Sequence, residues 1–106
     1  IGAMHESATI VRSGVISQNE MLRLKMSGSV GDVLCHFVDE YGALIPSDIE
    51  DRLISTPLEQ LRSMDNVIGL AAGTQKVEAI RAVLRGGYLD VLITDEPTAS
   101  LLLKGE

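Results

Sequence analysis

The second half of the chain alternates short apolar runs with amphipathic segments. Residues 66–72 and 89–94 are continuous apolar runs, the pattern of strands buried on both faces. Between them, residues 74–86 carry apolar side chains at helical spacing and end at two glycines, which often terminate helices. A last helix is predicted to begin near Pro97. Strand, helix, strand and helix with short connections predict two adjacent parallel strands joined by a right-handed crossover.

The first half is predicted to begin with two helices. Ser17 and Glu20 have the spacing of a capping box, which predicts a short helix over residues 18–26. The next stretch, GSVGDVLCHFVDEYG, predicts a second helix that ends at Tyr41 and Gly42. Its apolar side chains recur at i, i+3, i+4, i+7 and i+8, which is the stripe of an amphipathic helix. These side chains are Val30, Val33, Leu34, Phe37 and Val38.

The middle of the chain is predicted to be irregular. The stretches ALI and EDRLIST indicate two short strands joined by a turn around Pro46 to Asp48. A short helix should follow, with Pro57 at or near its first position. Together these elements predict a small α/β domain.

Length and charge restrict the function. A chain of 106 residues forms at most one small domain. A net charge of −6 and a pI near 4.8 argue against binding to a nucleic-acid backbone, which requires clustered Lys and Arg. A single cysteine, Cys35, excludes an internal disulfide and suits a reducing compartment. No apolar run has the length of a membrane span and no signal-peptide pattern opens the chain, so we expect a soluble, cytoplasmic protein. Because residue 1 is not Met, we also expect the chain to be a fragment of a longer protein.

Lys76 has an unusual position in the helix predicted over residues 74–86. Counting about 100° per residue, it lies among the apolar side chains, opposite the charged ones. A cation in a first helical turn also opposes the helix dipole, at a cost of roughly 0.3–1 kcal/mol unless an anion neutralises it. Lys76 should therefore either extend its ammonium group to solvent or contact an anion.

The residues just before Lys76 favour an anion site. Ligands of open parallel sheets bind beyond the carboxyl ends of the strands, and Gly73 and Thr74 form such a strand-to-helix junction. Gly73 would let a phosphate approach the backbone, Thr74 would cap the helix or donate its hydroxyl, and Lys76 would supply the charge. The alternative is an ordinary helix start. No Walker sequence is present, which argues against a nucleoside triphosphate.

Asp32 has two interpretations. Near the start of the predicted second helix, an acidic side chain compensates the helix dipole. Alternatively, Asp32 accepts hydrogen bonds from ligand hydroxyls, in surroundings that Gly28 and Gly31 keep unobstructed. His36 and Cys35 are predicted to be structural, because no second His or Cys lies at metal-ligand spacing, and no metal site is expected.

Thr94 and Asp95 follow the second apolar run. If the two predicted strands are parallel, both residues lie at the same edge of the sheet as Gly73 and Lys76. A ligand contact and a helix cap explain this placement equally well.

Four stretches of the chain, in order and spacing, carry a family resemblance. They are IGAMHESATIVRSGVISQNEMLRL, GSVGDVLCHFVDEYG, RLISTPLEQLR and GLAAGTQKVEAIRAVLRGGYLDVLITDEPTASLLL, and they cover nearly the whole chain. Together they resemble the carboxyl-terminal part of the sugar-binding domain of SorC/DeoR-type bacterial transcriptional regulators. The family pattern is similar to GAVGD, G-G-x-x-K-x-x-A-I and T-D-E-x-T-A. The chain departs from it at Ser29 and Ala72, two small changes that leave Gly73 and Lys76 intact.

The resemblance implies a Rossmann-like parallel sheet related to sugar-phosphate isomerases and glucosamine-phosphate deaminases. Residues 1–106 would be the carboxyl-terminal portion of one effector domain, whose first half and preceding helix-turn-helix are absent from the chain. In such proteins a phosphorylated sugar binds at the edge of the sheet and alters oligomer state or operator affinity. DNA would be bound only through the missing amino-terminal domain, and a homo-oligomer is expected.

The resemblance also implies roles for individual residues. Lys76 matches the phosphate-binding lysine, and Asp32 matches the acid near the sugar hydroxyls. Arg52 is a weaker candidate for a phosphate contact, and Gly73 and Thr74 complete the expected binding residues. No catalytic residue and no cofactor are implied.

Three functions remain open at this point. A binding module of a sugar-responsive regulator is favoured. A sugar-phosphate isomerase or deaminase of the same superfold is the alternative, because fold alone does not decide function. Such an enzyme needs a general base. Their spacing in the sequence does not place any two of the candidate residues together. These candidates are Asp32, Asp95, Glu96 and His36. A purely structural dimerisation fragment is the third possibility, because an open sheet edge can pair with another copy.

Overall fold

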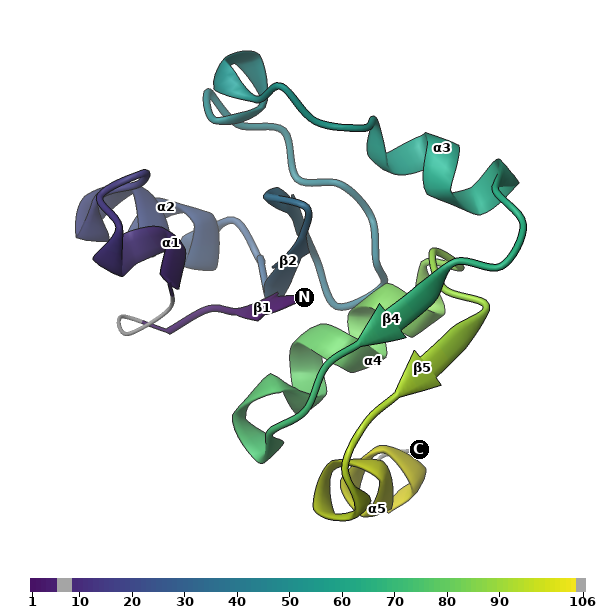
Figure 1. Cartoon of the computed structure of the whole chain (residues 1–106). Coiled ribbons are helices and arrows are strands. Elements are labelled where there is room, and N and C mark those ends of the chain that lie inside the picture. Colours follow the sequence, from purple (N-terminus) through teal and green to yellow (C-terminus); the bar gives the residue numbers. More distant parts are fainter. Residues whose placement is uncertain (6–8, 105–106) are drawn as a thin grey trace.

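The computed structural model describes residues 1–5 and 9–104 and contains two small sheets surrounded by short helices (Figure 1). The antiparallel sheet has the order β1 (Gly2–Ala3), β2 (Gly31–Val33) and β3 (His36–Val38), and the second sheet pairs β4 (Ile68–Leu70) with β5 (Val91–Ile93). The α-helices are α1 (Thr9–Arg12), α2 (Gln18–Met26), α3 (Leu58–Ser63), α4 (Val77–Arg85) and α5 (Glu96–Lys104). Two single-turn 3₁₀ helices are η1 (Glu50–Arg52) and η2 (Thr74–Lys76).

The strands β4 and β5 are parallel neighbours, as predicted, with Ile68 opposite Val91 and Leu70 opposite Ile93. The chain passes from β4 through η2 and α4 to β5 (Figure 1). The predicted helix beginning near Pro97 is α5. The predicted strand–helix–strand–helix order and the α/β class are thus confirmed.

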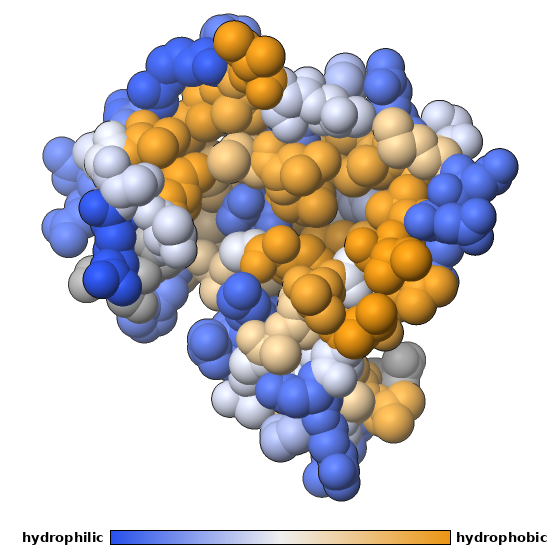
Figure 2. Space-filling model, viewed as in Figure 1, coloured by the Kyte–Doolittle hydropathy of each residue, from blue (hydrophilic) through white to orange (hydrophobic). Residues whose placement is uncertain are grey.

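One face of the β4–β5 pair is open to solvent. The side chains of Ile68, Leu70, Val91 and Ile93 share this face, and these residues are 60%, 78%, 47% and 52% exposed. Figure 2 shows a continuous hydrophobic area over these strands. The prediction that both strands are buried on both faces is wrong for the chain by itself, because within it only the opposite face, which carries Gly69, is buried.

The helix predicted over residues 18–26 is confirmed with both of its ends. Ser17 is the N-cap, its hydroxyl accepts a hydrogen bond from the Glu20 N–H, and the Glu20 carboxylate accepts one from the Ser17 N–H. Met21 and Leu24 are the buried residues of this helix. The capping box is a local signal, which is why the sequence locates this helix correctly.

The predicted second helix is wrong, because residues 31–38 form an antiparallel hairpin. The chain reverses at Leu34 and Cys35, which both have positive φ angles, 52° and 67°. β1 extends the sheet by pairing Gly2 with Asp32. Asp32 therefore lies on a strand and not in the first turn of a helix, so the interpretation as a dipole-compensating residue is also wrong.

Burial on both sides explains why the hairpin resembles a helix in sequence. Val33 and Val38 pack into one core cluster together with α3 and α4, whereas Phe37 packs into a second cluster with α2. A strand covered on both faces shows no alternation of apolar and polar residues, so its apolar positions can match helical spacing by chance. The β-branched valines and Gly31 favour extended backbone over helix.

The two strands predicted for ALI and EDRLIST do not form. Leu44 makes only an isolated bridge to Val38, and part of the second stretch is the 3₁₀ turn η1. The segment is held instead by the buried ring of His36, whose Nδ1 lies 2.8 Å from Glu50 Oε1 and whose Nε2 donates to the Thr56 carbonyl at 2.7 Å. The short helix predicted after Pro57 is confirmed as α3.

Tyr88 joins the end of α4 to the loop that follows β3. Its hydroxyl is buried and donates to the Gly42 carbonyl at 2.5 Å, and the Arg62 guanidinium lies 4.7 Å from the ring centroid. The backbones approach closely here, because a Cβ built on Gly42 would lie 2.5 Å from the Gly86 Cα.

Of the helices that the structure describes, none has the length and apolar character needed to cross a bilayer.

We predict that Tyr88→Phe lowers the free energy of unfolding by about 1–2 kcal/mol, because it leaves the buried Gly42 carbonyl without its donor. The matched control is Tyr41→Phe, which removes a hydroxyl from an exposed residue and should change stability by less than about 0.5 kcal/mol. Urea unfolding of both variants measures the difference. Equal midpoints for the two would contradict the role of the Tyr88 hydroxyl.

Candidate functional site

An open pocket of about 770 Å³ lies between the antiparallel sheet, α1 and η2. Asp32 and Cys35 line it from the hairpin, and Gln75 and Lys76 line it from η2. The start of the chain contributes Ile1 and, from β1, Gly2 and Ala3. Two segments far apart in the sequence, the β2–β3 hairpin and the turn after β4, therefore contribute polar groups to one cavity.

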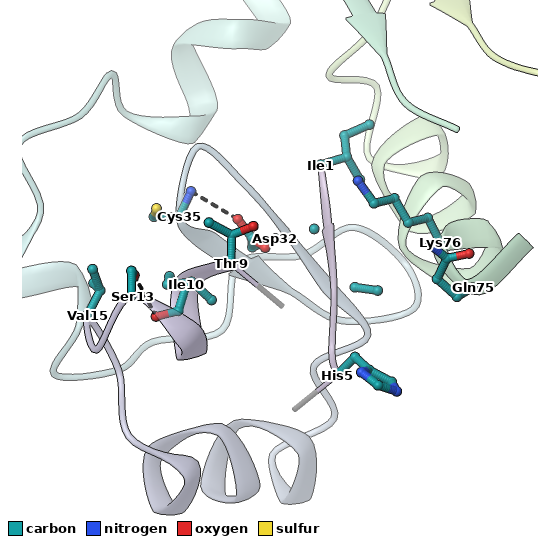
Figure 3. A pocket seen from close by; sticks show the side chains of 12 residues that line it. Ile1, His5, Thr9, Ile10, Ser13, Val15, Asp32, Cys35, Gln75 and Lys76 are labelled. Atoms are coloured by element: carbon teal, nitrogen blue, oxygen red, sulfur yellow. Dashed lines mark hydrogen bonds between the residues drawn. The ribbon is translucent and has the colours of Figure 1, made fainter. Parts of the chain in front are cut away.

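Lys76 is the last residue of η2 and lies directly before α4. It is half-buried and lines the pocket, and Figure 3 shows its side chain extending beside the start of β1 toward Ile1. The buried residues Ala79, Ile80 and Val83 of α4 continue from it along the helix. The prediction that Lys76 is not on the solvent face is confirmed.

Asp32 lies on β2 with its carboxylate against Gly2 of β1. A Cβ built on Gly2 would collide with Asp32 Oδ1, so the absence of a side chain at position 2 makes room for the carboxylate. Asp32 Oδ2 accepts a hydrogen bond from the Cys35 N–H at 3.2 Å (Figure 3). Burial raises the pKa of the Asp32 carboxyl, and the Cys35 N–H and the positive charge of Lys76 oppose this effect in part.

The turn that precedes Lys76 depends on Gly73. This residue has φ 120° and ψ 130°, a conformation that favours glycine, and it is the N-cap of η2. Its carbonyl accepts a hydrogen bond from the Lys76 N–H at 3.0 Å, and its N–H donates to Thr98 Oγ1 at 3.0 Å. Thr74 is exposed at the first position of η2, so the predicted cap by Thr74 is wrong and the cap residue is Gly73.

Thr94 and Asp95 follow β5, at the sheet edge where Gly73 follows β4. The contact between Gly73 and Thr98 joins the two turns, and the expectation that Lys76 and Thr94 share this edge is confirmed. Asp95 Oδ1 accepts a hydrogen bond from the Thr98 N–H at 2.9 Å, so the interpretation of Asp95 as a helix cap is confirmed. The Thr94 hydroxyl is buried and has no hydrogen-bond partner among the described residues.

Two other candidates, Arg52 and His36, make their contacts outside the pocket. Arg52 does not line the pocket, and its guanidinium donates to Glu20 Oε2 at 2.7 Å. His36 is 4% exposed and holds η1 and Thr56, as a structural histidine would. Cys35 lines the pocket beside Asp32. Within residues 1–5 and 9–104, no three His, Cys, Asp or Glu side chains gather as a metal site would require.

Two residues that contact the predicted site residues are missed by the sequence reasoning. Gly2 borders Asp32 only because β1 pairs with β2. A strand of two residues is too short to show a periodic pattern in the sequence. Thr98 contacts Gly73 across the sheet edge, 25 residues away in the chain. Its spacing of three residues from Asp95 is a capping signal that could have revealed its local partner, although not Gly73.

Comparisons with known proteins agree on a single family. The family model described as "Putative sugar-binding domain" matches residues 1–104. The transcriptional regulator LsrR of Klebsiella pneumoniae is 38% identical over 106 residues, which cover 97% of this chain and 33% of LsrR. The erythritol catabolism regulatory protein EryD of Brucella abortus is 39% identical over 103 residues, which cover 97% of this chain and 32% of EryD. The chain thus spans about a third of the length of these curated relatives.

Solved structures show the same fold. A DeoR family transcriptional regulator from Listeria monocytogenes superposes with a TM-score of 0.90 at 28% identity, covering 95% of this chain and 41% of that one. The full-length sorbitol operon regulator SorC from Klebsiella pneumoniae superposes with a TM-score of 0.78 at 31% identity, covering 81% of this chain and 28% of that one. The resemblance in the sequence motifs is therefore confirmed in three dimensions.

Asp32 should make stability depend on pH. Because its pKa is raised in the folded state, the folded chain holds the proton more tightly than the unfolded chain does, so ionisation of Asp32 destabilises the fold. This loss is absent below the unfolded pKa of about 3.9 and complete above the folded pKa. We predict that Asp32→Asn is more stable than the unmodified chain at pH 7 and that the gain disappears as the pH falls through this window.

Urea unfolding at pH 7 and at pH 3.5 measures this effect. The control is Asp65→Asn, which neutralises an exposed carboxylate and should show no comparable gain. A pH-independent difference between the Asp32→Asn variant and the unmodified chain would disprove the linkage.

Proposed function

The chain belongs to the sugar-binding domain family of transcriptional regulators, and from this premise we propose that it forms part of the effector site of a sugar-responsive regulator, with a phosphorylated sugar as the effector. In this proposal residues 1–106 are the carboxyl-terminal portion of one effector domain. Ligand binding would alter the affinity of the whole regulator for DNA.

The observation that carries the proposal is that Lys76 and Asp32 line one pocket. A sugar phosphate has an anionic end and several hydroxyl groups, and these require different partners. The Lys76 ammonium offers a charge-assisted hydrogen bond to phosphate, and the Asp32 carboxylate accepts hydrogen bonds from hydroxyls. The volume of about 770 Å³ lies within the roughly 300–1,000 Å³ typical of small-molecule sites.

The place of Lys76 at the start of a helix also favours an anion. A lysine there opposes the helix dipole, and a bound phosphate would turn this repulsion into a favourable arrangement of phosphate, ammonium and helix N-terminus. Gly73 and Thr74 shape the turn that would face the phosphate. Arg52 does not contribute to this proposal, since it pairs with Glu20 away from the pocket.

A regulatory role is preferred to catalysis because the matched relatives are named as regulators. An isomerase or deaminase would convert the sugar phosphate, whereas an effector module releases it unchanged. Incubation with the bound sugar phosphate followed by mass spectrometry and NMR of the small molecule distinguishes the two.

Lys76→Ala in the intact regulator should weaken the binding of a sugar phosphate by roughly 1.5–3 kcal/mol, the loss of a charge-assisted hydrogen bond. Calorimetric titration with a panel of pentose and hexose phosphates measures the change. Operator binding without effector should persist, because the substitution leaves the DNA-binding part untouched.

Two controls make this experiment specific. Lys104→Ala removes an exposed lysine from the last turn of α5 and should leave the affinity unchanged. The unphosphorylated form of the same sugar should bind the Lys76→Ala variant and the unmodified protein equally, because Lys76 is assigned to the phosphate. If Lys76 only extends to solvent, the substitution will not alter the affinity for the sugar phosphate, and the proposal fails.

The 106-residue chain alone should not bind DNA. With a net charge of −6 it repels the phosphate backbone, and this repulsion is strongest at low salt, where screening is weak. A mobility-shift assay with duplex DNA in low salt should show no complex at micromolar concentrations of the chain. A shifted band under these conditions would contradict the proposal that DNA is contacted only by another part of the regulator.

A further inference from the structure

A series of hydrogen bonds connects the turns that follow the two parallel strands. The Gly73 N–H donates to Thr98 Oγ1 at 3.0 Å, and the Thr98 N–H donates to Asp95 Oδ1 at 2.9 Å. Hydrogen bonding to Thr98 also lowers the pKa of the Asp95 carboxyl, because it stabilises the charged form. Thr98 therefore contacts both turns, the first through its hydroxyl oxygen at Gly73 and the second through its N–H at Asp95.

Thr98 is suited to hold a fixed position. It is 0% exposed and is the only residue of α5 that is fully buried among those the structure describes. Its hydroxyl oxygen accepts from one turn and its N–H donates to the other, so both turns hold it. Replacement by an apolar residue of the same shape would leave the Gly73 N–H without this partner.

Gly73 transmits this constraint to Lys76. Its N–H is held by Thr98, and its carbonyl accepts the Lys76 N–H at 3.0 Å. Both sides of a residue with φ 120° and ψ 130° are therefore fixed, and η2 begins from this point. The direction in which η2 places the Lys76 side chain depends on the orientation of the Gly73 peptide groups.

We propose that Thr98 is a positioning residue of the ligand site, whose buried hydroxyl fixes the Gly73 turn and thereby directs Lys76 into the pocket. This inference rests on the proposed function, because it assumes that Lys76 contacts the anionic group of the ligand. It also restricts how the ligand is bound: the Gly73 N–H is engaged within the protein, so Gly73 supports the site through its conformation and not by donating to phosphate.

The test compares Thr98→Val, which keeps the shape and removes the hydroxyl, with Thr98→Ser, which keeps the hydroxyl. Inorganic phosphate is the probe, titrated into the protein and followed by the ¹H–¹⁵N shifts of residues 73–76. Thr98→Val should weaken phosphate binding about five-fold or more and accelerate hydrogen exchange of the Gly73 amide about ten-fold or more, the scale expected for loss of a buried hydrogen bond. Thr98→Ser should restore both to within about two-fold.

Two further variants serve as references. Ser100→Ala removes an exposed hydroxyl from the same helix and should change neither quantity. Asp95 is exposed, and Asp95→Ala removes the acceptor of the Thr98 N–H. This variant should therefore also weaken phosphate binding, and it tests the inference even if Thr98→Val fails to fold.

The outcomes separate this inference from the proposed function. If Thr98→Val exposes the Gly73 amide to exchange but binds phosphate as tightly as the unmodified protein, Thr98 is structural only and the inference is overturned. Unchanged exchange of the Gly73 amide in that variant overturns it as well. If neither phosphate nor sugar phosphates bind the unmodified protein, the proposed function fails, and the Gly73 exchange data then assign Thr98 a purely structural role.

Discussion

The contact between Gly31 of β2 and Ala79 of α4 determines how the two halves of the chain fit together. A Cβ built on Gly31 would lie 2.6 Å from the Gly2 carbonyl oxygen and 3.0 Å from the Ala79 Cα, so the hairpin reaches the helix only because position 31 has no side chain. Asp32 is the next residue along β2, and Lys76 lies three residues before Ala79. The same approach therefore brings both charged groups to one pocket, although Asp32 and Lys76 are 44 positions apart in the sequence.

Elements that depend on neighbouring residues are predicted well from the sequence. The capping box at Ser17 and Glu20 locates α2 to the residue, and the apolar runs identify β4 and β5 because short connections leave a parallel pairing as the natural arrangement. The hairpin is mispredicted because its neighbours on both faces come from distant parts of the chain. The sequence of an apolar stretch does not show which elements will pack against it. α1 and β1 are too short to show any period.

The residues of the candidate site likewise divide into those identified by local features and those that depend on distant contacts. The position of Lys76 emerges from helix phase and the helix dipole, both of which are local properties. Reasoning from spacing places Asp32 in a helix that does not form and leaves its role open between dipole compensation and a ligand contact, and the family resemblance favours the ligand contact. Gly2 and Thr98 act through contacts across the sheet pairing and the sheet edge, and neither contact is encoded in the residues nearby.

The exposed aliphatic face of the β4–β5 pair has a consequence for the colloidal behaviour of the chain. Contiguous apolar patches promote association between copies, and near neutral pH the net charge of −6 opposes it by mutual repulsion. That repulsion vanishes near the pI of about 4.8, where solubility should pass through its minimum. Mildly acidic solutions thus favour protonation of carboxyl groups and, at the same time, aggregation of the chain through Ile68, Leu70, Val91 and Ile93.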